Sequence, residues 1–191
     1  MRSRRMLPAR HLLALLLLAP GVAFAQSPTY GVGRTPTPEE IRAWDIAISP
    51  TGEELPPGSG TAVQGAVVYQ QKCAACHGAQ GTGGIAPRLV KPDRAVGNPW
   101  DYGRILPIRS PYSSLVWDYV NRGMPLGQEE TLTADEVYGL TALLLYWNDL
   151  VAEEEVMDAE SLPRVAMPNE DNWAPLPDWQ PGQPRLPDYP Y

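Results

Sequence analysis

The sequence predicts an all-α domain, and three observations support this prediction. Residues 61–152 contain three segments with helix signals, at 61–73, 112–122 and 133–149. Residues 78–111 are rich in Gly and Pro and show little periodicity, which is typical of loops. No apolar stretch beyond the N-terminal segment reaches membrane-spanning length. We therefore expect a small helical domain with long connections.

The N-terminal segment has the parts of a secretory signal peptide. Four arginines precede the apolar run at residues 12–19, and small residues follow at 23–25. The run is shorter than the roughly 20 residues that a membrane span needs. We expect cleavage before Gln26 and a periplasmic protein without a membrane span. An uncleaved membrane anchor is the alternative.

Cleavage would leave 166 residues with 11 basic and 22 acidic side chains, a net charge of −11. This balance argues against nucleic acid or an anionic membrane as a partner and suits a basic docking patch. The predicted organisation is a signal peptide (1–25), a Pro/Gly-rich extension (26–60), the helical domain (61–152) and an acidic, Pro-rich tail (153–191). Because such flanks cannot build a core of their own, we expect them to wrap around a larger partner.

Helix signals define each element in turn. A short helix should follow Thr37, with proline at its first position and two glutamates in its first turn. The helix at 61–73 should place Val63 and Val67 on one side, with Val68 and Gly65 beside them.

The next two helices carry cap signals. The helix at 112–122 should end at Gly123, a suitable C′ residue. Thr133 and Glu136 form a capping box for the last helix. Apolar residues then recur at helical spacing: Val137, Leu140, Leu144 and Trp147.

The chain's two cysteines lie in the motif Cys73-Ala-Ala-Cys76-His77, the attachment pattern of a c-type haem. Two thiols three residues apart can bond the two vinyl groups of one porphyrin, and the adjacent histidine can bind the iron. A disulfide or thioredoxin-like site would give His77 no task and needs a βαβ context that is missing here. A structural zinc site needs four ligands, and no other Cys or His follows the signal peptide. We predict one covalent haem c.

The second axial ligand of the iron must be sought among the methionines. Met124 lies in "RGMPLG", between the second and third helices, where a loop could fold over the opposite haem face. A thioether ligand raises the haem potential. Met167 is its competitor, and Met157 is expected to pack. We therefore predict His77 and Met124 as the axial pair.

Haem propionates need hydrogen-bond donors, and one loop is rich in them. Residues 98–112 supply four candidates: Trp100, Tyr102, Arg104 and Arg109. Arg88 is a further one, and the alternative is an ordinary loop with solvated arginines. Trp117 or Tyr119 should touch the porphyrin or simply pack in the core.

The stretches "GAVVYQQKCAACHG", "APRL", "MP" and "LTADEVYGLTALLL" resemble, in order, the landmarks of class I cytochromes c over residues 61–150. The resemblance implies that the first and last helices cross, with Gly65 and Tyr69 meeting Leu140 and Leu144. The family often has an aromatic residue where this chain has Leu143.

The resemblance also implies a role for Pro87. Its carbonyl would accept a hydrogen bond from the second ring nitrogen of His77, fixing the ring and raising its basicity.

The flanks resemble a narrower group. "YGVGRTPTPEEIRAWDIAISPTGEELPPGSG" and "DAESLPRVAMPNEDNW" look like the cytochrome subunit of periplasmic sulfane and sulfite dehydrogenases. Such subunits take electrons from a molybdenum-cofactor subunit and pass them to another cytochrome c or an oxidase. No substrate-converting site is expected here. The alternatives are a free electron carrier, a subunit of another respiratory complex, or a haem-free thiol–disulfide protein.

Overall fold

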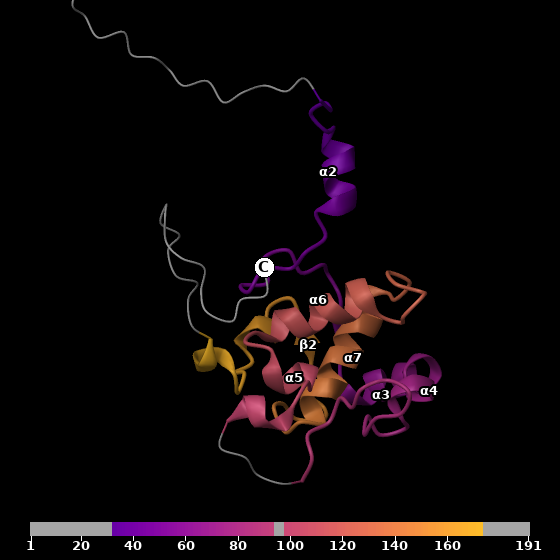
Figure 1. Cartoon of the computed structure of the whole chain (residues 1–191), viewed down its shortest axis with the longest axis vertical. Coiled ribbons are helices and arrows are strands. Elements are labelled where there is room, and N and C mark those ends of the chain that lie inside the picture. Colours follow the sequence, from indigo (N-terminus) through magenta and orange to yellow (C-terminus); the bar gives the residue numbers. More distant parts are fainter. Residues whose placement is uncertain (1–31, 94–97, 174–191) are drawn as a thin grey trace, which may run out of the picture. The chain divides into compact units, whose positions relative to one another are not determined.

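The computed structural model describes residues 32–93 and 98–173 (Figure 1). The predicted signal peptide and the end of the tail lie outside these residues. By its internal contacts the chain divides into two units, and the second, from Arg42 onward, holds every element after α2. In the described residues the helices are α2 (Pro38–Trp44), α3 (Ala62–Lys72), α4 (Ala74–His77), α5 (Leu106–Arg109), α6 (Ser113–Gly123) and α7 (Ala134–Tyr146).

The described residues contain little other regular structure. Two strands of two residues each, β1 (Ser59–Gly60) and β2 (Met157–Asp158), form one antiparallel pair. Three 3-10 turns complete the elements: η1 (Pro99–Tyr102), η2 (Leu162–Arg164) and η3 (Glu170–Asn172). The predicted all-α fold is confirmed.

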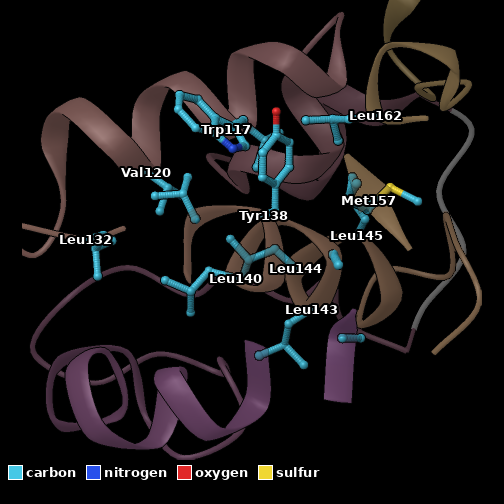
Figure 2. Packing of buried hydrophobic residues seen from close by; sticks show 14 of the residues in the cluster. Trp117, Val120, Leu132, Tyr138, Leu140, Leu143, Leu144, Leu145, Met157 and Leu162 are labelled. Atoms are coloured by element: carbon cyan, nitrogen blue, oxygen red, sulfur yellow. The ribbon is translucent and has the colours of Figure 1, made fainter. Parts of the chain in front are cut away.

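Helix α7 is the centre of the domain. Every residue from Val137 to Leu145 is buried, so the helix is covered on all sides. Figure 2 shows α7 between α6, which contributes Trp117 and Val120, and α3, toward which Leu143 lies. The capping box of Thr133 and Glu136 is present, as predicted. The central position explains why the segment is so apolar.

Helices α3 and α7 cross at two glycines. A Cβ atom built on Gly65 would lie 1.9 Å from the carbonyl oxygen of Gly139. A Cβ atom on Gly60 of β1 would lie 2.4 Å from the backbone nitrogen of Gly139. No side chain fits at either contact, so the backbones themselves touch. The predicted crossing is present, and Gly139 is the partner that the prediction lacked.

The buried face of α3 is the one that carries Gly65 and Tyr69, as the family resemblance implies, and not the side with the valines. Ala62, Gly65 and Tyr69 are buried, whereas Val63 and Val67 are 44% and 60% exposed. The helix turns its smallest residue toward α7 because the crossing requires close approach, and the valines therefore face outward. Apolarity alone pointed to the wrong side of this helix.

Much of the flanking sequence packs on its own domain, which corrects the expectation that the flanks only wrap around a partner. Leu55 of the N-terminal extension belongs to the core. So do three residues of the tail: Met157, Leu162 and Met167. Pairing of β1 with β2 joins the two flanks, because Gly60 lies opposite Met157. The flank residues 46–60 and 153–169 therefore form a second layer that packs on the helices.

Hydrogen bonds fasten this layer to the helices. The buried carboxylate of Asp118 on α6 accepts a bond from the Ile48 backbone (3.0 Å), and Arg122 also binds it. The hydroxyl of Tyr138 on α7 donates to the Pro56 carbonyl (2.9 Å). On the tail side, the Ser113 hydroxyl donates to the Leu162 carbonyl (2.5 Å).

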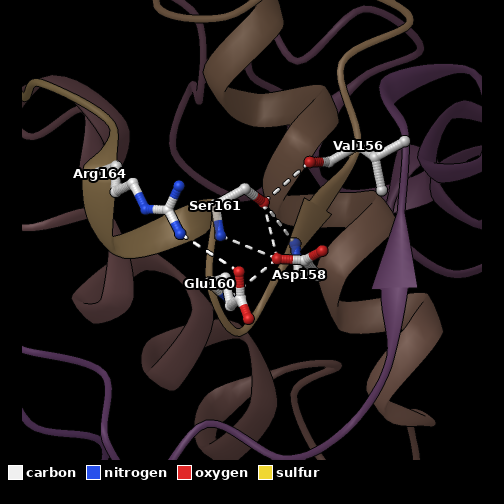
Figure 3. Close-up of polar contacts among 5 residues, drawn as sticks. All are labelled: Val156, Asp158, Glu160, Ser161 and Arg164. Atoms are coloured by element: carbon white, nitrogen blue, oxygen red, sulfur yellow. Dashed lines mark hydrogen bonds and ion pairs between the residues drawn. The ribbon is translucent and has the colours of Figure 1, made fainter.

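A compact turn follows β2 in the tail (Figure 3). One carboxylate oxygen of Asp158 accepts bonds from the backbone nitrogens of Glu160 and Ser161, both at 2.8 Å. The Ser161 hydroxyl donates to the Val156 carbonyl (2.8 Å). These bonds hold the pKa of Asp158 below its usual range. The turn reverses the chain so that Leu162 returns to the core.

The helix ends differ slightly from the predicted ones. Gly123 is the last residue of α6, and Met124, not Gly123, caps it. Helix α7 closes with backbone bonds from Leu150 to Leu145 and from Asp149 to Tyr146, a Schellman pattern. Asp149 takes the left-handed position usually given to glycine, with φ of 62°. The last turn therefore reaches close to the predicted end at residue 149.

An ion pair links α3 to the cap of α7 and gives a testable pH dependence. The Lys72 ammonium lies 2.6 Å from Glu136, which also caps α7. Lys72 first, and the Thr133 backbone next, hold the pKa of Glu136 below its ordinary value of 4.5. A carboxyl with a lowered pKa stabilises the fold above its unfolded value, and this contribution is lost as pH falls through the folded value.

We therefore expect Glu136→Gln to lower the free energy of unfolding by about 0.5–1 kcal/mol at pH 7, because glutamine keeps the capping box but loses the ion pair. Urea unfolding at several pH values checks this. The two proteins should converge below pH 4.5, as Glu136 becomes protonated. A difference that persists unchanged into acid would contradict the electrostatic origin.

Candidate haem site

Cys73 joins the helix α3 to the short helix α4, which carries the rest of the motif. Its backbone nitrogen donates to the Tyr69 carbonyl, as in a continuing helix. Its carbonyl accepts bonds from Cys76 (3.1 Å) and His77 (3.0 Å). One helical turn therefore presents both thiols and the imidazole, an arrangement suited to bonding one porphyrin edge.

Backbone contacts fix the loop after the motif. The Tyr69 hydroxyl donates to the Gly78 carbonyl (2.8 Å), and burial raises the pKa of this phenol to about 12. Gly78 has φ of 80°, which ends α4 with a left-handed residue. The loop then returns, because Gly83 donates to the His77 carbonyl and Ala86 donates to the Cys76 carbonyl. The motif is thus held from α3 and from its own loop.

The imidazole of His77 is oriented by Pro87. The ring Nδ1 lies 2.7 Å from the Pro87 carbonyl oxygen. A carbonyl can only accept, so Nδ1 carries the proton and Nε2 is left with a free lone pair. This is the hydrogen bond that the family resemblance implies, and it leaves Nε2 as the atom able to bind iron.

The thiols do not resemble a redox-active pair. Cys73 and Cys76 are both free, and burial raises the pKa of Cys73 to about 11. Reactive Cys-x-x-Cys thiols have a lowered pKa instead. Among the described residues, no group of three Cys, His, Asp or Glu side chains could hold a metal ion. The site therefore favours thioether attachment of a porphyrin over thiol exchange or zinc.

The three methionines of the described residues lie in different surroundings. Met157 is fully buried (Figure 2). Met167 is 6% exposed, and both methionines belong to the core cluster. Met124 is half-buried at the end of α6, where its backbone nitrogen donates to the Val120 carbonyl. Met124 therefore differs from the other two in that its side chain is not part of the packed core.

Of the predicted propionate donors, the structure brings Trp100 and Arg109 into contact with each other. The Arg109 guanidinium lies 4.1 Å above the ring of Trp100, and Trp100 also packs against Trp173. Arg104 is exposed, and Tyr102 is half-buried within η1. Arg109 therefore has a packing role in this structure, in a cluster with Trp100 and with Trp173 of the tail.

The buried side-chain atoms that lack a hydrogen-bond partner in the described residues include two nitrogen donors. The Nε atom of Arg88 and the indole Nε1 of Trp117 are buried without a hydrogen bond. Unpaired buried donors are costly, and their presence points to a missing acceptor. Arg88 directly follows Pro87, on the loop that orients His77. An anionic group such as a haem propionate would satisfy such donors, so the residues present fit the cofactor.

The helical fold, the Cys-x-x-Cys-His turn and its proline acceptor together define a class I c-type cytochrome. Residues 60–144 match the model of the family described as cytochrome c oxidase, cbb3-type, subunit III. A chain in the crystal structure of the sulfane dehydrogenase SoxCD from Paracoccus pantotrophus is 39% identical, with a TM-score of 0.65. That match covers 77% of this chain and 72% of the other.

The chain therefore belongs to the c-type cytochrome family, in the Sox-type group that includes this SoxCD chain. Its cofactor is haem c and its role is electron transfer. No curated protein matches the chain. None of the described helices is both long and apolar enough to cross a membrane.

Sequence reasoning missed two residues that shape the site. Gly139 is recognisable only as a small residue inside an otherwise large and apolar helix. Asn148 is fully buried and makes three side-chain hydrogen bonds, two of them to the segment after Pro87. In the sequence, Asn148 is recognisable only as a polar residue directly after the aromatic pair Tyr146 and Trp147, where α7 ends.

Proposed function

We propose that this chain is the monohaem electron-transfer subunit of a periplasmic molybdenum enzyme that oxidises sulfane sulfur or sulfite. Residues 1–25 would be removed on export. The chain would accept electrons from the molybdenum-cofactor subunit and pass them to another cytochrome c or an oxidase. Chemical conversion of the sulfur substrate would take place in the partner.

The extent of the SoxCD match carries this proposal. It covers 77% of the 191 residues, about 147, whereas the cytochrome family model spans about 85. At least about 60 aligned residues therefore lie outside the stretch that the family model matches. A free carrier needs no such flanks, so their shared presence supports the same kind of subunit. The SoxCD protein is itself a sulfane dehydrogenase.

In the proposed site the two thiols bind the cofactor covalently. Cys73 and Cys76 would form one thioether bond each, which fixes the porphyrin edge against α4. When bound, the haem supplies an iron centre that changes by one electron between the ferrous and ferric states. With one Cys-x-x-Cys-His motif in the sequence, we propose one haem per chain.

Two side chains, His77 and Met124, would hold the iron of the bound haem. His77 would bind through Nε2 while the Pro87 carbonyl holds its Nδ1 proton, and this bond makes the ring a stronger donor. Met124 would approach the opposite face, where its thioether raises the potential. With both ligands supplied by the protein, the cofactor would serve electron transfer and not substrate binding.

The buried donors would pair with the propionates. The Arg88 guanidinium offers a charge-assisted bond, and the Trp117 indole a neutral one. Such bonds would give both donors the acceptor that they lack. We place these two ahead of the exposed Arg104 and of Arg109, whose guanidinium already stacks on Trp100.

Purification of the tagged chain from its native host tests the function. We expect a co-purifying subunit with about one molybdenum per complex, and haem reduction when sulfite or a sulfane compound is added. A haem-loaded chain that purifies alone, without molybdenum, would favour the free carrier. Reduction by respiratory enzymes but not by sulfur compounds would favour a subunit of another respiratory complex.

A further inference from the structure

We propose that Asn148 is a positioning residue for the axial histidine. Its side-chain amide ties the segment after Pro87 to the last turn of α7 and thereby keeps the Pro87 carbonyl in place at His77. This inference rests on the proposed function, because it takes His77 to be the iron ligand.

The side-chain amide of Asn148 forms hydrogen bonds with three backbone groups. The Nδ2 atom donates to the carbonyls of Leu144 (2.7 Å) and Leu89 (2.9 Å). The Oδ1 atom accepts from the Lys91 backbone nitrogen (2.9 Å). Two carbonyls face Nδ2 and one N–H faces Oδ1, so the orientation of the amide is fixed by its partners. One bond stays within α7, and two reach the segment 89–91.

The same segment is held on its other side by the haem motif's loop. The backbone nitrogens of Leu89 and Val90 both donate to the Gly81 carbonyl, at 2.7 and 3.2 Å. Gly81 lies four residues after His77. The segment therefore bridges the loop of the motif and the end of α7, and Asn148 supplies the α7 side of the bridge.

Residues 87–91 have no helix or strand to fix them. Their position depends on the contacts of the individual residues. Pro87 lies two residues before Leu89, so a shift at Leu89 reaches the carbonyl that accepts the His77 proton. An ion pair between Lys91 and Asp149 also links this segment to the end of α7. Solvent-exposed ion pairs contribute little to stability, however. The buried amide is the stronger link.

Asparagine suits this place chemically. Aspartate could accept from Lys91 but could not donate to Leu89, and leucine would leave two carbonyls and one N–H buried without partners. The bond from His77 to Pro87 sets how strongly the imidazole donates to the iron. Asn148 would therefore tune the reduction potential without touching the cofactor.

The test uses Asn148→Ser in the holoprotein. A serine hydroxyl can still bond the Leu144 carbonyl four residues earlier in the helix, but it is too short to reach Leu89 or Lys91. The matched control is Leu145→Ala, which truncates a buried side chain of the same helix and leaves the Asn148 amide in place. Both variants should have a lower free energy of unfolding than the wild type, so a loss of stability alone does not test the inference.

Two measurements distinguish a residue that positions the Pro87 carbonyl from one that only stabilises the fold. In Asn148→Ser the ratio of ferrous to ferric protein at a fixed solution potential should rise about threefold to tenfold, tenfold being about 59 mV for one electron. The His77 Nδ1 proton, followed by NMR in the ferrous protein, should exchange with water at least about tenfold faster. Neither should change in Leu145→Ala.

If Asn148→Ser matches Leu145→Ala in both readouts, Asn148 is a structural residue only and the inference is wrong. If Asn148→Ser yields no holoprotein, Asn148→Thr, which keeps the same intrahelical bond, carries the same comparison. A pyridine-haemochrome spectrum on every sample shows whether haem is attached. Its absence in the wild type would contradict the proposed function rather than the role of Asn148.

Discussion

Replacing Gly65 with alanine is expected to lower the free energy of unfolding by about 3 kcal/mol or more. The new Cβ atom would lie 1.9 Å from the Gly139 carbonyl oxygen, and backbone cannot rotate away as a side chain can. Overpacking in a core costs about 1–3 kcal/mol, and more where the neighbours are rigid. Urea unfolding of the ferric protein measures the loss.

Gly123→Ala supplies the control for Gly65→Ala. Gly123 also lies in a helix, but the nearest atoms to its added Cβ are 3.9 Å away in the Tyr119 ring. Alanine there should be neutral or stabilising by up to about 1 kcal/mol, because alanine favours helices over glycine. Glycine-to-alanine substitution should thus be strongly destabilising at position 65 and neutral or stabilising at position 123. Equal unfolding midpoints for both variants would contradict the close crossing of α3 and α7.

Replacing Met124 with alanine is expected to change the spectrum and potential far more than the stability. A c-type haem with thioether ligation has a ferric charge-transfer band in the far red, and this band should disappear. The potential should fall by on the order of 0.1 V, within the roughly 0.8 V that axial ligands span. Redox titration and absorption spectroscopy check both effects.

Met167→Ala should give the reverse pattern. Met167 is 6% exposed in the core, so its truncation should cost about 2–5 kcal/mol while the far-red band remains. Met157, fully buried beside it in the tail layer, should behave likewise. If Met167→Ala abolishes the band and Met124→Ala does not, the proposed axial pair is wrong.

Local signals predicted the helices and the motif well. The capping box of Thr133 and Glu136 and the proline after Thr37 each mark a helix start, and both helices begin there. The Cys-x-x-Cys-His turn needs only neighbouring residues, so its geometry follows from spacing. The His77–Pro87 bond spans ten residues and was implied by the family resemblance, not by any local pattern.

Tertiary contacts limited what the sequence could show. Val63 and Val67 look like a core face, but the contact that decides the rotation of α3 is between Gly65 and Gly139, which are 74 positions apart. Packing of the Pro-rich flanks depends on partners such as Asp118 and Tyr138, which no pattern in the flanks reveals. Leu143 stands where the family often has an aromatic residue, and four positions later Trp147 packs edge-on against Tyr69, with ring centroids 4.8 Å apart.

Intact-mass measurement of the exported, mature protein tests the central claim most directly. The polypeptide beginning at Gln26 should carry the added mass of one haem, and this added mass should disappear when Cys73 and Cys76 are both replaced with alanine. A mature chain with unmodified thiols and no added mass, from a host that attaches haem c to other proteins, would contradict covalent haem attachment and the electron-transfer role that depends on it.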